Sequence, residues 1–264
     1  MDLKLTGKTA LVSGSTGGIG FAIAQSLAQE GASVIINGRS EKRVNWAIDK
    51  INALPPKHKP SGIAVNLSTR DGAEQLFQQV PTVDILVNNL GFYEPKAFGD
   101  ITDDDWLNIF EANVLSGIRL SRQYLPAMLK QDWGRIIFIS SESAVQIPVE
   151  MIHYGMTKTA QIAIARGLAE MTVGTNVTVN SVLPGPTRSE GVGDFVSKMA
   201  SDRGVDVTQV EKEFFESVRP SSLLKRFATS EEVAALVTYL SSPVSSATNG
   251  AALRVDGGVV RSIL

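Results

Sequence analysis

The sequence predicts an α/β fold in which a doubly wound parallel sheet of about seven strands carries helices on both faces. Short apolar runs alternate along the chain with segments whose apolar residues have helical spacing. Near the N-terminus, one such run at 9–13 leads through a glycine-rich turn into a helical segment at 21–28. The 264 residues suit one large domain, and no linker divides them.

Seven apolar runs are the predicted strands, and helices are expected between them. The strongest break is the proline-rich stretch from Pro55 to Pro60, which we interpret as a loop between the second helix and the third strand. In an open sheet of this kind, ligands bind outside the carboxyl ends of the strands. The runs lie near 8–13, 33–37, 62–66, 83–88, 135–140, 176–182 and 251–255.

The glycine-rich turn after the first strand predicts a nucleotide site. Gly14, Gly18 and Gly20 let the backbone turn sharply and approach a ligand closely. The free N–H groups at the start of the following helix suit a pyrophosphate. A lone glycine pattern can be a structural turn only, but a strand before it and a helix after it favour nucleotide binding.

Tyr154 and Lys158 are candidates for proton chemistry. Residues at i and i+4 lie on one face of a helix, so the ammonium group is expected beside the phenol. A neighbouring cation favours the phenolate and lowers the phenol pKa toward a catalytically useful range. Tyr-x-x-x-Lys also occurs by chance on many helices, so the other motifs decide its meaning.

Composition narrows the function classes. The formal charge of −2 gives no reason to expect nucleic acid or an anionic membrane as partner. The absence of cysteine removes disulfides and thiolate zinc sites, and two histidines, His58 and His153, make a dedicated metal site an unfavoured interpretation. No signal core or membrane-spanning apolar stretch is present, so a soluble, cytoplasmic protein is expected.

These motifs together resemble the classical short-chain dehydrogenases/reductases over essentially the whole chain. The spacing from Ser141 to Tyr154 and the order of the motifs both match that family. The matching landmarks are Ser13–Gly20, Asn88-Asn89-Leu90-Gly91, Asn113, Ser141, Tyr154 with Lys158, Pro184-Gly185 and Val255–Gly258.

The resemblance implies a single Rossmann-like domain over 1–264, with a cofactor half at about 1–100 and a catalytic and substrate half at about 101–264. The substrate loop is expected at about 188–220. The implied activity is an NAD(P)(H)-dependent oxidoreductase that interconverts a small-molecule carbonyl and an alcohol by hydride transfer. A 3-oxoacyl-acyl-carrier-protein reductase is an alternative, disfavoured by Asp132 and Thr175 where that group carries arginines.

The family's catalytic roles carry over to four residues. Tyr154 is the general acid or base, and Lys158 lowers its pKa and bonds the nicotinamide ribose. Ser141 polarises the carbonyl oxygen, with Ser140 or Ser143 as alternatives, and Asn113 holds a water in a proton relay or only bonds the helix backbone. A non-enzymatic nucleotide-binding relative is disfavoured because the tyrosine, lysine and serine are all present.

NADP(H) is predicted in preference to NAD(H). The strand at 33–37 has no carboxylate at its end to bond a ribose 2′-hydroxyl, and Arg39 follows instead. Arg39 could also be an ordinary solvated arginine, as the neutral Gly17 allows. The predicted cofactor-binding residues are Gly14, Ser15, Gly18, Ile19, Gly20, Arg39, Asn66, Leu67, Asn89, Gly91, Tyr154, Lys158, Pro184, Gly185 and Thr187.

The resemblance also implies self-association. Family members pair through two long helices, expected here at about 104–130 and 152–173. Small and apolar residues from Ile162 to Ala169 offer more than one packing face. A homodimer or homotetramer is therefore predicted.

Overall fold

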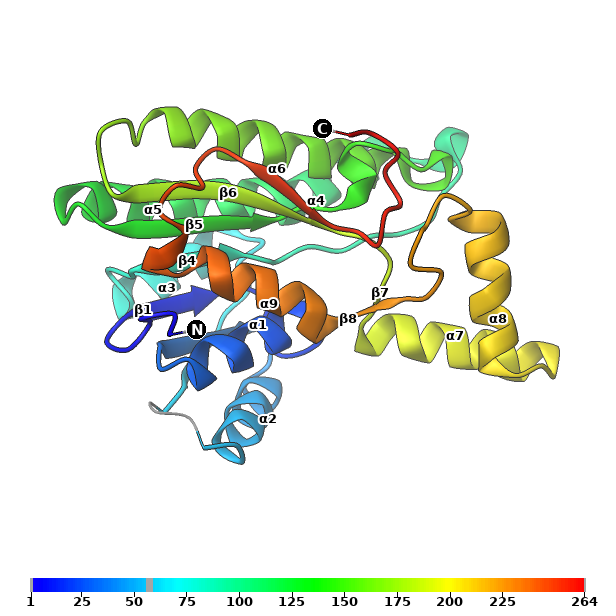
Figure 1. Ribbon diagram of the computed structural model, residues 1–264, viewed down its shortest axis with the longest axis horizontal. Coiled ribbons are helices and arrows are strands. Elements are labelled where there is room, and N and C mark those ends of the chain that lie inside the picture. Colours follow the sequence, from blue (N-terminus) through cyan, green and yellow to red (C-terminus); the bar gives the residue numbers. More distant parts are fainter. Residues whose placement is uncertain (1, 56–58, 264) are drawn as a thin grey trace.

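The computed structural model describes residues 2–55 and 59–263, so the predicted loop positions 56–58, His58 included, lie outside the described residues. Its core is a seven-stranded parallel sheet in the order β3-β2-β1-β4-β5-β6-β9 (Figure 1). Each strand begins and ends within a few residues of its predicted run, which confirms the predicted sheet. The strands are β1 (Thr9–Val12), β2 (Ser33–Gly38), β3 (Ser61–Ala64), β4 (Ile85–Asn88), β5 (Gly134–Ile139), β6 (Val177–Pro184) and β9 (Ala252–Val255).

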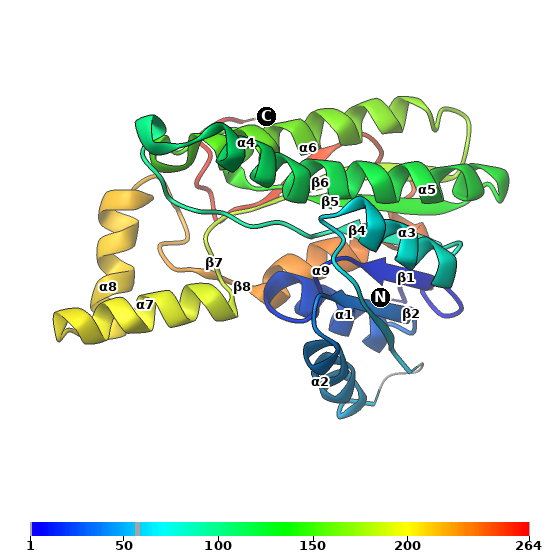
Figure 2. The ribbon, with the colours of Figure 1, turned by 180° about the vertical axis from the view of Figure 1, so that it is seen from behind.

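Helices cover both faces of this sheet. On one face, α1 (Gly18–Gln29), α2 (Glu41–Asn52) and α9 (Ser230–Leu240) enclose one apolar cluster. On the other, α3 (Arg70–Gln79), α5 (Ser116–Lys130) and α6 (Ile152–Glu170) enclose a second (Figures 1 and 2). This arrangement confirms the doubly wound fold.

The helix predicted at 104–130 contains an interruption. α4 (Asp103–Phe110) begins at a capping box in which Thr102 accepts from the Asp105 amide, and a π-helical turn at Glu111–Leu115 joins it to α5. π-Helical turns are frequent at functional sites because they reposition backbone carbonyls. Asn113 lies within this turn.

The segment predicted as a substrate loop at 188–220 is mostly helical. α7 (Glu190–Arg203), α8 (Val207–Glu213) and a π-helical turn at Phe214–Val218 form an arm that projects from the sheet (Figures 1 and 2). Its base is a small parallel pair, β7 (Thr187–Arg188) with β8 (Ala228–Thr229), which the sequence did not predict. The arm has its own apolar cluster, which includes Phe215 and Phe227.

No helix within residues 2–55 and 59–263 is both long enough and apolar enough to cross a membrane.

Candidate active site

The predicted site residues gather at one edge of the sheet. Gly14 follows β1, Asn88 ends β4, Ser141 follows β5 and Pro184 ends β6. Because all these strands are parallel, their carboxyl ends meet along the same edge. The structure therefore brings together residues that are far apart in the sequence.

The glycine turn leaves the start of α1 open to a ligand. Gly14 and Gly18 have φ angles of +61° and +54°, a backbone conformation that favours glycine. Gly17, at the N-cap, supplies no side-chain cap, and the first helical hydrogen bond runs from the Phe21 amide to the Gly17 carbonyl. The preceding amides of Gly18, Ile19 and Gly20 thus have no helical partner and fit the pyrophosphate of a dinucleotide.

Hydrogen bonds from the buried side chains of Asn37 and Ser15 stabilise the glycine turn. The buried Asn37 side chain accepts from the Gly14 amide at 3.1 Å and donates to the carbonyls of Ile63 and Val65, both at 3.2 Å. The Ser15 hydroxyl donates to the Val12 carbonyl at 2.7 Å and accepts from the Asn37 amide at 2.9 Å.

Two of the predicted cofactor contacts have structural roles. Ser15 is fully buried, and its hydroxyl both donates and accepts within the protein, so these bonds compete with the predicted contact to the cofactor, which stays a prediction. The Asn89 amide group donates to the carbonyls of Ser13 and Gly14, both at 3.0 Å. Asn89 therefore fixes the shape of the turn from the end of β4.

Two arginines lie near the far end of the glycine turn. Arg39 follows β2, is exposed, and makes no hydrogen bond or ion pair with another described residue. Arg43, in α2, reaches the carbonyl of Thr16 in the turn at 3.4 Å. A Cβ atom on Gly38 would lie 2.5 Å from the Thr16 side chain, so β2 ends directly beside the turn. The sequence pattern pointed to Arg39 alone.

Ser141, rather than Ser140, has its side chain beside Tyr154. The Ser140 hydroxyl donates to the Lys158 carbonyl at 2.8 Å and is directed into the protein. Ser141 caps a short 3₁₀ turn by accepting from the Ser143 amide, donates its hydroxyl to Glu142 Oε2 at 2.5 Å, and lies close enough to Tyr154 to lower the pKa of the phenol. This geometry supports Ser141 over Ser140.

The Tyr154 phenol has a raised pKa, which differs from the lowered value expected from its neighbour Lys158. Burial raises the pKa of Tyr154 above its usual value of 10, and the hydrogen bond with Ser141 opposes this only in part. Burial also lowers the pKa of Lys158 to about 7. Because the Lys158 Nζ lies 5.5 Å from the phenol ring centre and readily loses its charge, desolvation outweighs its attraction for a phenolate.

Lys158 is held by neutral acceptors at the base of the site. Its Nζ donates to the Ile139 carbonyl at 2.9 Å and to the Gln161 side-chain oxygen at 3.3 Å. The Gln161 Nε2 in turn donates to the Asn113 carbonyl at 2.6 Å. The Asn113 carbonyl thus has one protein donor, and the relay water expected at Asn113 stays a prediction.

The Asn113 side chain fastens the loop after β4. Its Oδ1 accepts from the Phe92 amide, and its Nδ2 donates to the Phe92 carbonyl and to the Thr157 hydroxyl. The alternative kept open from the sequence was a bond to the helix backbone, whereas the side chain bonds the backbone of this loop. Gly91 packs against the same group, since a Cβ there would lie 3.1 Å from Asn113 and 3.4 Å from the Lys158 Nζ.

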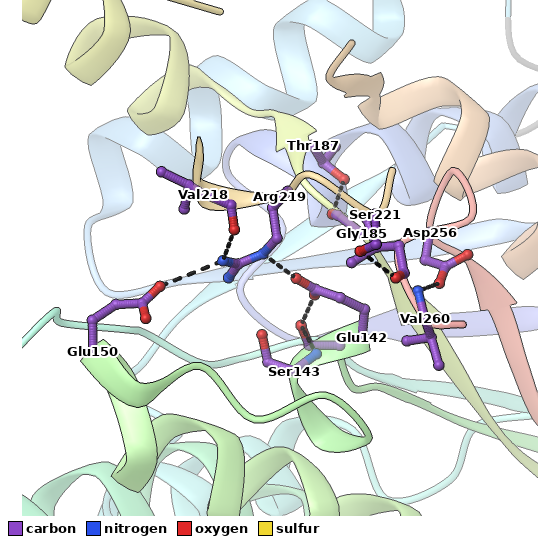
Figure 3. Close-up of polar contacts among 12 residues, drawn as sticks. Glu142, Ser143, Glu150, Gly185, Thr187, Val218, Arg219, Ser221, Asp256 and Val260 are labelled. Atoms are coloured by element: carbon purple, nitrogen blue, oxygen red, sulfur yellow. Dashed lines mark hydrogen bonds and ion pairs between the residues drawn. The ribbon is translucent and has the colours of Figure 1, made fainter. Parts of the chain in front are cut away.

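The remaining predicted cofactor residues lie around the same edge. Gly185 follows β6 and packs on the Asp256 backbone, and the Thr187 hydroxyl donates to the Gly185 carbonyl at 2.9 Å (Figure 3). Asn66 is exposed in the loop after β3, whereas Leu67 is buried.

Three functional candidates were not predicted from the sequence. Glu142 follows Ser141, Arg219 lies at the end of the arm, and Gln161 lies one turn beyond Lys158. The glutamate and glutamine positions carry a signal that could have been used, since each is a polar residue near a catalytic one. Arg219 carries no such signal because its partners lie 77 and 69 residues away in the chain.

Comparison with known proteins agrees with this geometry. The family described as short chain dehydrogenase matches residues 8–200. The chain is 52% identical over 263 residues to the oxidoreductase YvaG of Bacillus subtilis (strain 168), with 100% of both chains covered. It is 34% identical to the 3-oxoacyl-acyl-carrier-protein reductase FabG of Aquifex aeolicus (strain VF5), over 98% of this chain and 100% of that protein.

Solved structures give the same answer. L-Sorbose reductase from Gluconobacter frateurii, in complex with NADPH and L-sorbose, matches with a TM-score of 0.92 and 29% identity over 100% of both chains. Together, the family match, the relatives and the fold show that the chain belongs to the short-chain dehydrogenase/reductase family of NAD(P)(H)-dependent oxidoreductases.

Proposed function

We propose that Tyr154 is the general acid of a ketone reductase and the general base of the reverse reaction. The observation that carries this proposal is the convergence of Tyr154, Ser141 and Lys158 at the carboxyl edge of the sheet. A bound nicotinamide supplies the hydride that reduces the carbonyl carbon. Tyr154 gives its proton to the carbonyl oxygen, which becomes the hydroxyl of the alcohol.

The raised pKa of Tyr154 suits the reductive direction. A phenol that remains protonated at neutral pH is ready to donate, and burial raises its pKa above the usual value. On this proposal the Ser141 hydroxyl, which donates to Glu142 Oε2 in the structure, turns its single proton to the carbonyl oxygen when a substrate binds. Lys158, with a pKa lowered to about 7, is poised to exchange a proton near neutral pH, and it would bond the ribose of a bound nicotinamide cofactor.

The preferred cofactor, on this proposal, is NADP(H). The exposed Arg39, which directly follows β2 and has no ion-pair partner among the described residues, supports this preference because a guanidinium bonds a phosphate in bidentate fashion. The L-sorbose reductase structure contains NADPH, which agrees with the preference. Steady-state kcat/KM with NADPH and with NADH tests it directly, and a wild-type preference for NADH contradicts it.

A cofactor-oxidation screen over ketones, sugars and acyl thioesters tests the proposed chemistry. Tyr154→Phe should lower kcat at least about 10²-fold and leave NADPH affinity nearly unchanged, because the ring still packs and only the acid is lost. Tyr93→Phe is the matched control, since the Tyr93 ring lies 6.0 Å from the Tyr154 ring and is half exposed. If Tyr154→Phe kept most of the activity, the assignment of the acid would be wrong.

A homotetramer is part of the same proposal. Among the described residues, β9 is an edge strand whose one neighbour in the sheet is β6, and Leu107 on α4 exposes 66% of its surface. Such features support association through a strand edge and a helix face. Light scattering at micromolar concentration tests it, and a monomeric mass contradicts it. The cytoplasmic location expected from the sequence stays a prediction.

A further inference from the structure

A buried carboxylate lies directly beside the catalytic serine. Glu142 is only 5% exposed, and its Oε2 accepts the Ser141 hydroxyl at 2.5 Å. Burying an ionised carboxylate costs several kilocalories per mole unless it is paired and hydrogen-bonded. Glu142 meets both conditions, through Ser141 and through an arginine of the arm, so the fold keeps a paired carboxylate next to the reacting centre.

The partner of this carboxylate comes from the arm. Arg219, which directly follows the π-helical turn at Phe214–Val218, donates its Nε to Glu142 Oε1 at 3.2 Å. Its NH1 reaches Glu150 Oε1 at 3.4 Å, so the guanidinium lies between two carboxylates (Figure 3). The Arg219 side chain is 12% exposed, and the Glu150 side chain is 42% exposed. Two negative charges thus face one positive charge.

The pair is within electrostatic reach of the acid. Glu142 raises the pKa of Tyr154 and Arg219 lowers it, with the exposed ring of Tyr93 and the ammonium of Lys158 as the other nearby polar groups. A substrate carbonyl that accepts from the Tyr154 hydroxyl therefore places its neighbouring substituents close to Glu142, which is bonded to the adjacent Ser141.

The carboxylate of Glu142 retains acceptor capacity. An ionised carboxylate offers about four lone-pair positions, and Glu142 receives one donor on each oxygen from the described residues. A substrate hydroxyl is the complementary group, because it can donate to a free lone pair. A carboxylate or phosphate on the substrate is not, because Arg219 is already engaged by two carboxylates and the local charge is negative.

We propose that Glu142, oriented by Arg219, selects uncharged substrates that carry a hydroxyl group next to the reacting carbonyl, as in hydroxyketones and ketoses. This inference rests on the proposed function, since it names the substrate class of the same site. Glu142 is the specificity-determining residue and Arg219 is a positioning residue that acts through it.

The competing explanation is that the ion pair only fastens the arm. Arg219 has a second carboxylate partner, Glu150, which gives a matched control: it bonds the same guanidinium, whereas the Ser141 hydroxyl bonds Glu142. If the ion pair only fastened the arm, neutralising either glutamate would lower kcat/KM by the same factor for all substrates.

Three ketones that differ in one group test the inference: hydroxyacetone, butanone and pyruvate. The wild-type enzyme with NADPH should show a kcat/KM for hydroxyacetone at least about tenfold above that for butanone, with pyruvate the poorest. Glu142→Gln should lower the hydroxyacetone-to-butanone ratio of kcat/KM at least about fivefold. It should also raise kcat/KM for pyruvate relative to that for butanone. Glu150→Gln should leave the hydroxyacetone-to-butanone ratio within about twofold of wild type.

The outcomes separate the two levels of the proposal. Equal wild-type rates with hydroxyacetone and butanone, or an unchanged ratio in a Glu142→Gln enzyme that still binds NADPH, would overturn the role of Glu142 and leave the reductase function standing. The wild-type ratio tests the preference even if the variant fails to fold. Reduction of none of these ketones, nor of any compound in the wider screen, would overturn the reductase function and this inference with it.

Discussion

The glycine turn at 14–20 and the arm at 190–218 both border the active site, but different contacts fix them. The turn is held by buried side chain to backbone hydrogen bonds from Asn37, Ser15 and Asn89. The arm is held by a separate apolar cluster and, where it ends, by the ion pairs of Arg219.

This difference separates binding from selection. The turn belongs to the sheet, because its braces come from the ends of β2 and β4, so it should loosen only when the whole domain unfolds. The arm has a core of its own and few ties to the sheet, so it can open locally. On the proposed function, the turn would thus hold the cofactor in a preformed site and the arm would adjust to the substrate.

The largest expected effect that tests this comparison lies in the arm. Phe215 is 2% exposed and packs its ring 5.0 Å from Phe214 and 5.1 Å from Phe227. Phe215→Ala should destabilise the arm by about 3–5 kcal/mol, the usual cost of such a truncation. Hydrogen exchange should show loss of protection across 190–218, and substrate turnover should fall.

The same variant has a built-in control in the cofactor half. NADPH affinity and the exchange rates of β1 and α1 should stay close to wild type, because these elements pack in a different apolar cluster from the arm. Loss of protection throughout the sheet would mean that the arm and the sheet unfold as one unit, and the comparison would be wrong.

The second prediction concerns the brace beneath the glycine turn. Asn37→Ala leaves the Gly14 amide and the carbonyls of Ile63 and Val65 without their partner. The free energy of unfolding should fall by about 2–3 kcal/mol, and NADPH should bind more weakly. Denaturant unfolding and NADPH fluorescence measure the two effects. Normal stability with weakened binding would show that Asn37 does not brace the fold.

These two regions also differ in how far the sequence predicts them. The sheet, its strand bounds and the glycine turn follow from apolar periodicity and from glycine positions, which are local signals. Local signals work here because strand, turn and helix are neighbours in the chain.

The substrate side depends on contacts that span long stretches of sequence. Nothing near Arg219 in the chain indicates that it bonds Glu142, and the helices of the arm were expected as a loop. Ser15 was assigned to the cofactor because its position suits a phosphate, but its hydroxyl bonds Val12 and Asn37. The pKa of Tyr154 was expected to fall, and burial, which the sequence does not show, raises it.

The third prediction uses the buried lysine of the catalytic site. Burial lowers the pKa of Lys158 from 10.5 in the unfolded chain to about 7 in the fold. Between these values the unfolded chain holds a proton that the folded protein has released, so stability from this group rises with pH. The slope is at most about 1.4 kcal/mol per pH unit. The free energy of unfolding of the wild-type protein, measured with denaturant, should therefore rise relative to that of Lys158→Met from pH 7 to pH 9. A constant difference between the two proteins would show that Lys158 titrates as an ordinary lysine.

The smallest effect expected is at the rim of the cofactor site, where Arg39 is exposed and salt screens its charge. Arg39→Ala should lower kcat/KM for NADPH about tenfold and that for NADH less than about twofold, since only NADPH carries the 2′-phosphate that the guanidinium would bond. Arg43→Ala is the matched control, because Arg43 is a second arginine beside the turn and has the Thr16 carbonyl as a partner. A smaller NADPH loss in Arg43→Ala than in Arg39→Ala would assign the phosphate to the residue after β2. Equal losses of kcat/KM with both cofactors in Arg39→Ala would show instead that Arg39 attracts both cofactors equally. Other residues would then select between NADPH and NADH.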